Sequence, residues 1–139
     1  MTSIEIFKKN FLFGSGVRSF RIECQKKEYD MIISKSKDIR CSTHPHNFYL
    51  EILSETGILS FALFLALLAF TIYNSAKLLY LGNKSFILIS FFIVFLSILW
   101  PLRSTGSIFS NFGGSMMWLN FAFLFAINSK LNKFYKINN

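Results

Sequence analysis

The chain has 139 residues, which allows one domain at most, and 53% of them are apolar while only 16% are charged. Phenylalanine alone occurs 18 times, which is abnormal for the surface of a soluble protein and indicates contact with lipid. A formal charge of +8 suits nucleic acid in principle, but the basic residues do not cluster on one predicted helix face. We therefore predict no nucleic-acid partner and favour membrane lipids and phosphate-bearing substrates.

A glycine pair follows a short polar lead at residues 1–10. Residues 11–20 hold Gly14 and Gly16 on either side of one serine. Two glycines at this spacing permit a tight turn and a close approach of another group to the backbone. No strand and no long helix flank the pair, so a dinucleotide site is excluded.

Two cysteines bracket the polar segment 22–40, which we predict to be a loop with a short helix. If this segment is extracytoplasmic, oxidising conditions permit a disulfide between Cys24 and Cys41. Such a bridge would stabilise the fold by roughly 3 kcal/mol in the chain-entropy model. Two free thiols are the alternative. The cysteines have the wrong number and spacing for a zinc site, even with His44 and His46 nearby, so we predict no metal.

The stretch 41–57 holds the only two histidines and is predicted to start a helix. Pro45 suits the first helical position, with Thr43 or His44 as the cap. That geometry would put His46 in the first turn. The positive end of the helix dipole disfavours an imidazolium there, so His46 is expected to stay neutral, as a general base must be.

An anion-binding group lies beside this predicted helix start. Arg40 comes just upstream and is able to hold a phosphate as a bidentate fork. A neutral base beside an anion site suits transfer from a phosphate-activated donor to a hydroxyl. The alternative is that the two histidines simply cap an interfacial helix. In the following turns, Asn47, Glu51 and Glu55 lie four residues apart on one helix face.

Three apolar stretches fill most of the remaining chain. Residues 57–73 are nearly all apolar, and a helix that runs on to about residue 80 is long enough for a bilayer span, which needs about 20 residues. Further spans are predicted at 86–102 and 108–127, followed by a polar tail at 128–139. Phenylalanines at helical spacing within these spans are expected to contact lipid or neighbouring helices.

The charges of the short loops predict the orientation. The turn 74–85 carries two lysines and the tail three, whereas the loop 103–114 carries only Arg103. By the positive-inside rule the lysine-bearing sides are cytoplasmic, which leaves residues 1–50 and the Arg103 loop outside. The nine basic residues of the N-terminal segment oppose this, so the chain alone could insert the other way. Arg103 would hold a diphosphate or anchor the helix at the interface.

Three motifs resemble one family. HPHNFYLEILSETGILS (44–60) is similar to the histidine motif of the O-antigen ligase and O-antigen polymerase family, in which a His-Asn pair opens a helix. FGSGVRSF (13–20) is similar to the glycine-rich segment that precedes that motif, and WPLRSTGSIFSN (100–111) to the tract after the next pair of membrane helices. The motifs occur in the order that the family has.

The resemblance implies a fold and a location. We expect an all-α integral membrane protein with three transmembrane helices, preceded by a periplasmic loop segment with a short helix. Residues 1–50 would form that segment and residues 51–139 a membrane domain with a cytoplasmic tail. The chain would be the C-terminal part of a larger polytopic fold in the bacterial inner membrane, multi-pass, with its active face in the periplasm.

The resemblance also implies an activity, which is glycosyl transfer in lipopolysaccharide biosynthesis. The donor would be an undecaprenyl-diphosphate-linked glycan, and the acceptor a lipid A-core sugar for a ligase or a growing glycan for a polymerase. His46 would be the catalytic base, and no cofactor is implied. Groups expected to hold the diphosphate or glycan are Arg40, Arg18, Arg21, Arg103, His44 and Asn47.

The motifs do not separate a ligase from a polymerase. Members of the family carry many more N-terminal membrane helices than this chain. We therefore keep a second hypothesis, in which the chain is an inactive remnant, or a subunit that works only with a partner chain supplying the missing helices.

Overall fold

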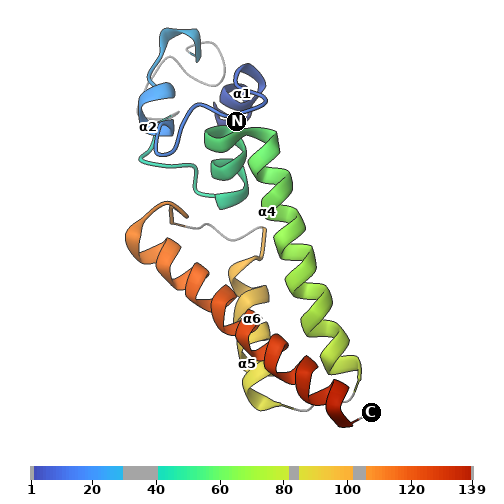
Figure 1. The fold of residues 1–139 in the computed structure, drawn as a ribbon. Helices are drawn as coiled ribbons and strands as arrows, with labels where there is room; N and C mark the ends of the chain where they lie inside the picture. Colours follow the sequence, from blue (N-terminus) through green and yellow to red (C-terminus); the bar gives the residue numbers. More distant parts are fainter. Residues whose placement is uncertain (1, 30–40, 82–84, 102–105, 139) are drawn as a thin grey trace. The chain divides into compact units, whose positions relative to one another are not determined.

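The computed structural model describes residues 2–29, 41–81, 85–101 and 106–138, with side chains to residue 133. The described residues form helices, turns and loops and no strand, so the all-α prediction is confirmed for them. The elements in chain order (Figure 1) are α1 (Thr2–Lys9), α2 (Phe20–Glu23), the 3-10 helix η1 (Lys27–Tyr29), α4 (Phe48–Tyr80), α5 (Phe86–Ile98) and α6 (Asn111–Asn138).

The chain forms two compact units. The first comprises Met1–Phe64 with Pro101–Gly114, and the second comprises Leu65–Trp100 with Ser115–Asn139. Helices α4 and α6 each contribute residues to both units. The division into a periplasmic segment and a membrane domain concerns location and remains a prediction.

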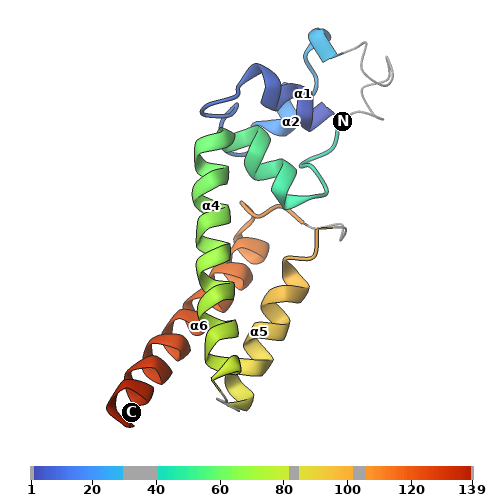
Figure 2. The same ribbon diagram turned by 90° about the vertical axis from the view of Figure 1, so that its right-hand side faces the viewer.

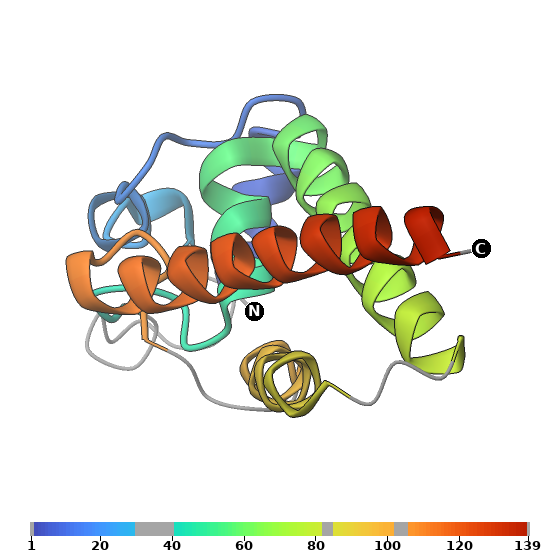
Figure 3. The same ribbon diagram turned by 60° about the horizontal axis from the view of Figure 1, so that its bottom comes forward.

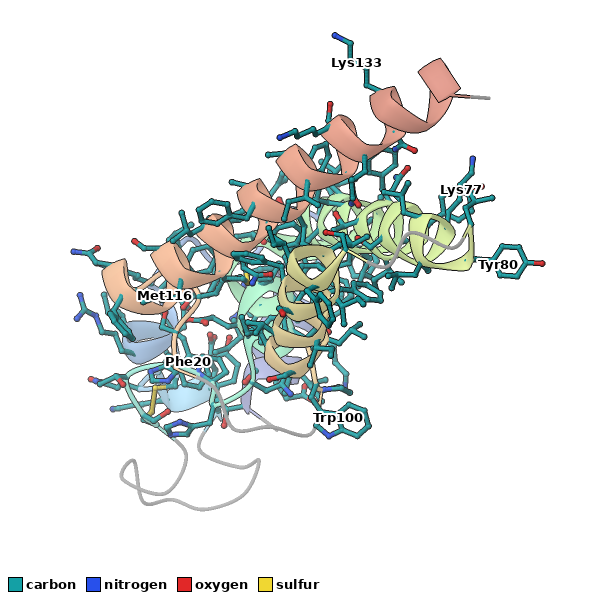
Figure 4. All side chains as sticks on the ribbon, turned by 90° about the horizontal axis from the view of Figure 1, so that it is seen from below. Phe20, Lys77, Tyr80, Trp100, Met116 and Lys133 are labelled. Atoms are coloured by element: carbon teal, nitrogen blue, oxygen red, sulfur yellow. A yellow bond between two sulfur atoms is a disulfide. The ribbon has the colours of Figure 1, made fainter. Side chains whose placement is uncertain are left out.

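A small apolar core lies in the first unit. Ile6 of α1, Phe20 of α2, Cys24 and Tyr29 are buried together, and Cys41 packs against them. A disulfide joins Cys24 to Cys41, with 5.4 Å between their Cα atoms (Figure 4). Burial raises the pKa of the Tyr29 phenol to about 12. The disulfide therefore fastens residue 41, just before the histidines, to this core.

Helix α4 bends sharply at Gly57, whose φ of 76° and ψ of −177° are not helical. The break exposes a backbone donor, and the Ile58 N–H donates to the carbonyl of Phe11 at 2.9 Å. A Cβ on Gly57 would collide with the backbone of Leu12. Glycine is required here both for its positive φ and for the close approach of the two backbones.

Gly14 makes the corresponding close contact from the glycine-rich segment. Its φ is 70°, and a Cβ on it would collide with the backbone of Glu55. On the same stretch, the Ser15 N–H donates to the Ser54 carbonyl at 3.0 Å and the Gly16 N–H to the Glu55 carbonyl at 2.8 Å. The glycine-rich segment thus satisfies carbonyls that the bend in α4 leaves without helical partners.

Aromatic contacts and a buried hydrogen bond hold together the helices of the second unit, whose ribbons Figure 3 shows. The ring pairs, with their centroid distances, are Phe70–Phe125 at 5.7 Å, Phe91–Phe123 at 5.0 Å and Phe95–Phe121 at 4.8 Å. The amide of Asn128 donates to the hydroxyl of Ser75 at 3.0 Å. At the helix ends, Lys77, Tyr80 and Lys133 extend outward (Figure 4). Phenylalanine therefore serves helix packing in part of this unit.

Among the described residues, one helix is long and apolar enough to cross a membrane, namely α4. Helix α5 is apolar but has only 13 residues, which gives a length of about 20 Å against a hydrocarbon core of about 30 Å. Helix α6 has 28 residues and does not meet the same criteria of apolarity and charge. The prediction of three spans is therefore not confirmed.

The bend in α4 gives a test of stability. Gly57→Ala should lower the melting temperature of the protein in detergent micelles, measured by far-ultraviolet circular dichroism. A positive φ combined with an extended ψ is essentially restricted to glycine and costs an alanine about 1–3 kcal/mol, and the contact with the Leu12 backbone adds to that cost. Gly106→Ala is the matched control, because no atom of the described residues lies within 4 Å of a Cβ at that position. Equal melting temperatures for the two variants would show that the bend is not needed.

Candidate active site

Helix α4 starts three residues later than predicted. Its first helical residue is Phe48, and the side-chain oxygen of Asn47 accepts hydrogen bonds from the backbone N–H groups of Tyr49 at 3.0 Å and Leu50 at 3.2 Å. Asn47 is therefore the N-cap, a position that asparagine favours. The predictions that Pro45 is the first helical residue and that Thr43 or His44 is the cap are wrong.

His46 lies just outside the helix, directly before the cap. It therefore does not occupy the first helical turn, the position in which a neutral imidazole was expected. Its side chain is exposed, and none of the described residues forms a hydrogen bond with it. Its ring meets that of His44 edge-on, with the centroids 4.9 Å apart. The Nδ1 of His44 is hydrogen-bonded to the Thr43 hydroxyl at 3.0 Å. Of the two rings, His46 is the more accessible to a substrate.

Glu51 holds the loop that precedes α6. Its carboxylate accepts a hydrogen bond from the Ser107 hydroxyl at 2.5 Å and another from the Ile108 N–H at 2.8 Å. The side chain is 1% exposed. One turn earlier, the amide of Asn47 donates to the Pro101 carbonyl at 2.7 Å. The first turns of α4 therefore fix both ends of the third motif.

Glu55 holds the glycine-rich segment in the same way. Its carboxylate accepts hydrogen bonds from the backbone N–H of Arg18 at 2.6 Å and that of Phe20 at 3.1 Å, and the residue is 1% exposed. No described lysine or arginine forms an ion pair with Glu51 or Glu55. Both carboxylates are instead held by N–H and O–H donors of the two segments.

Arg18 links the glycine-rich segment to the third motif. Its φ is 59°, a conformation that is uncommon outside glycine. Its guanidinium donates to the Phe109 carbonyl through Nε at 3.0 Å and Nη2 at 2.5 Å. The side chain is exposed, so its remaining N–H groups face solvent. The backbone is held in this strained form by the bond to Glu55.

The structure brings together the three motifs that the sequence singled out. The histidine motif bonds to the glycine-rich segment through Glu55 and to the third motif through Glu51. Arg21 lies exposed on α2. Arg40 and Arg103 lie outside the described residues. Asn47, predicted to bind substrate, uses both polar atoms of its side chain within the protein.

Sequence analysis gave no role to Glu51, Glu55 or Ser107. A signal was present, because the last two of only seven acids in the chain stand one turn apart directly before an apolar run. Burying an acid in that position costs free energy unless hydrogen-bond donors surround its carboxylate. The described residues contain no group of three or more potential metal ligands.

The comparisons with known proteins bear on this arrangement. Residues 1–65 match the family model described as O-antigen ligase. The family resemblance is confirmed for this part of the chain. The matched part contains the glycine-rich segment, both histidines and both buried glutamates, while the third motif follows it. No curated protein and no solved structure matches.

The carboxylate of Glu55 gives a test of the site's architecture. Glu55→Gln replaces one acceptor oxygen by an NH₂ group that faces a backbone donor, so one N–H of the glycine-rich segment loses its partner at a cost of about 1–3 kcal/mol. Trypsin should then cut after Arg18 and Arg21 roughly tenfold faster or more.

Glu5→Gln is the matched control, because Glu5 forms only an exposed pair with Lys8, and such pairs contribute little. The cleavage rate is read from the peptides that trypsin releases. Cleavage of Glu55→Gln at the control's rate would contradict the role given to Glu55.

Proposed function

We propose that this chain takes part in glycosyl transfer from an undecaprenyl-diphosphate-linked glycan to a sugar hydroxyl, at the periplasmic face of the bacterial inner membrane. One observation supports this most. The segments that resemble the O-antigen ligase family, far apart in the sequence, are bonded to one another where α4 begins, and an exposed histidine stands beside them. A lipid A-core sugar is the acceptor in the ligase form of the proposal.

His46 is the proposed general base. It would take the proton of the acceptor hydroxyl as the oxygen attacks the anomeric carbon of the donor glycan. The bond between that carbon and the diphosphate oxygen breaks, and undecaprenyl diphosphate leaves with the bonding electrons. The ring of His46 is exposed and forms no hydrogen bond with the described residues, which supports this role. His44 is the weaker choice, since its Nδ1 is engaged by Thr43.

Arginines are proposed to bind the departing diphosphate. Arg18 and Arg21 are exposed in the same unit as His46, and neither forms an ion pair with a described residue. Guanidinium groups suit diphosphate oxygens because they donate in parallel pairs. Arg40 and Arg103 are proposed as further contacts from their places in the sequence. Charge that develops on the leaving group would be stabilised by these donors.

The proposed location follows from the apolar helix. Helix α4 would cross the bilayer, and α5 and α6 would form a second and a third span. The lysines that follow the apolar parts of α4 and α6 favour a cytoplasmic side for those ends under the positive-inside rule. His46 and the glycine-rich segment would then face the periplasm. A partner chain that supplies further helices is part of the proposal, because a groove for a polyprenyl chain needs more than three helices.

The base assignment has a direct test in cells that lack their own O-antigen ligase. The chain is expressed alone and together with the N-terminal helices of a ligase, and glycan attached to lipid A core is measured by gel electrophoresis. His46→Ala should lower attachment by roughly 10²- to 10⁴-fold, the usual effect of removing a general base. His44→Ala is the matched control and should lower it much less.

The product that forms decides between the ligase form and the polymerase form of the proposal. Attachment that depends on His46 supports the ligase form. Longer glycans on the undecaprenyl carrier, again dependent on His46 but not joined to lipid A core, support the polymerase form. If all versions reach the membrane and neither product forms under either condition, the transfer proposal is overturned.

A further inference from the structure

The segment between α1 and α2 exposes its apolar side chains. Phe11 and Leu12 are each 51% exposed, Phe13 is 75% exposed and Val17 is 58% exposed. Single exposed apolar residues are ordinary on protein surfaces, but three consecutive ones with a fourth nearby form a patch. Such a patch indicates a surface that is in contact with other apolar groups, from lipid or from protein.

The backbone of this segment is fixed in a way that keeps these side chains outside. The Phe11 carbonyl accepts from Ile58, and the Ser15 N–H donates to Ser54. Gly14 and Gly57 let the two backbones touch, so no room for a side chain remains between them. Residues 11–13 therefore cannot bury their side chains against α4 without breaking these bonds.

The contacts also fix the depth of the segment along α4. They fall at the bend of α4, which Figures 1 and 2 show. The helix becomes apolar after the bend. The next turns of α4 expose Leu59, at 51%, and Leu63, at 73%. The exposed side chains of the segment thus continue the apolar surface with which the candidate membrane span begins.

Unpaired cations border the patch on one side. Lys8 and Lys9, before it, form ion pairs with Glu5 and Glu28, whereas the arginines after it form no ion pair with a described residue. Arg18 and Arg21 are exposed directly after the apolar residues. An apolar surface bordered by cations is the combination that binds an anionic phospholipid interface, with the side chains among the acyl chains and the cations at the phosphates.

We propose that Phe11, Leu12 and Phe13 form a loop inserted into the leaflet from which α4 enters the membrane, with Arg18 and Arg21 at the depth of the lipid phosphates. The occupant of the patch is phospholipid. The inference requires α4 to cross the bilayer and does not depend on any transfer activity. Its consequence is that the strained turn at Arg18 stands at the depth where the diphosphate of any polyprenyl-linked molecule lies.

A single tryptophan reports the position of the loop. Trp100 and Trp118 are the native tryptophans, and changing both to phenylalanine gives a silent background. Phe13→Trp in that background is reconstituted into vesicles of phosphatidylethanolamine and phosphatidylglycerol, with and without brominated acyl chains. Gln25→Trp is the matched control, because Gln25 is exposed in the same unit among charged residues.

The expected result is a blue-shifted emission for Phe13→Trp that brominated lipid quenches and aqueous acrylamide does not. Gln25→Trp should show the opposite. Leu12→Trp is a second probe, used if circular dichroism shows that Phe13→Trp has lost helix. Quenching of both loop probes by acrylamide to the extent of Gln25→Trp would overturn the inference.

Protection of the loop probes from both quenchers would also overturn it, because protein rather than lipid would then cover the patch. The measurement is independent of glycan transfer. Insertion of the loop without glycan transfer would mean that the transfer proposal alone has failed. Glycan transfer without insertion would mean that the loop proposal alone has failed.

Discussion

Two buried carboxylates on the first turns of α4 hold the rest of the candidate site in place. Glu51 and Glu55 are each 1% exposed, and each receives two hydrogen bonds from a segment that is distant in the sequence. Buried backbone N–H groups need acceptors, and a buried carboxylate needs donors. Each hydrogen bond meets both needs. Polar contacts therefore fix these segments to the helix in addition to the apolar packing of Phe20 and Ile108.

Two glycines determine how closely the glycine-rich segment approaches α4. Gly14 and Gly57 allow two backbones to meet where any larger residue would collide. That contact bends α4, frees the Ser54 and Glu55 carbonyls for the glycine-rich segment, and brings Arg18 to the carbonyl of Phe109. The strained φ of Arg18 is thus a consequence of the same close contact.

The site stands at a boundary between two kinds of sequence. All seven acids precede Gly57, and the long apolar part of α4 follows it. The bend therefore separates a part whose polar groups are satisfied within the protein from a part that is suited to lipid. The exposed side chains of residues 11–13 lie next to that bend.

The sequence by itself determined the helical class, the apolar segment that became α4 and the resemblance of residues 1–65 to the O-antigen ligase family, because periodicity, composition and short motifs are local properties. It missed α1, a short polar-looking segment whose Ile6 is buried only against later residues. It misplaced the start of α4, since several residues could cap that helix and geometry chose Asn47. Only the tertiary structure gave Glu51, Glu55 and Arg18 their partners, which lie between 35 and 91 positions away. A hydrogen bond over that distance leaves no periodic pattern in the sequence, so it is decided when the loops fold onto the helix.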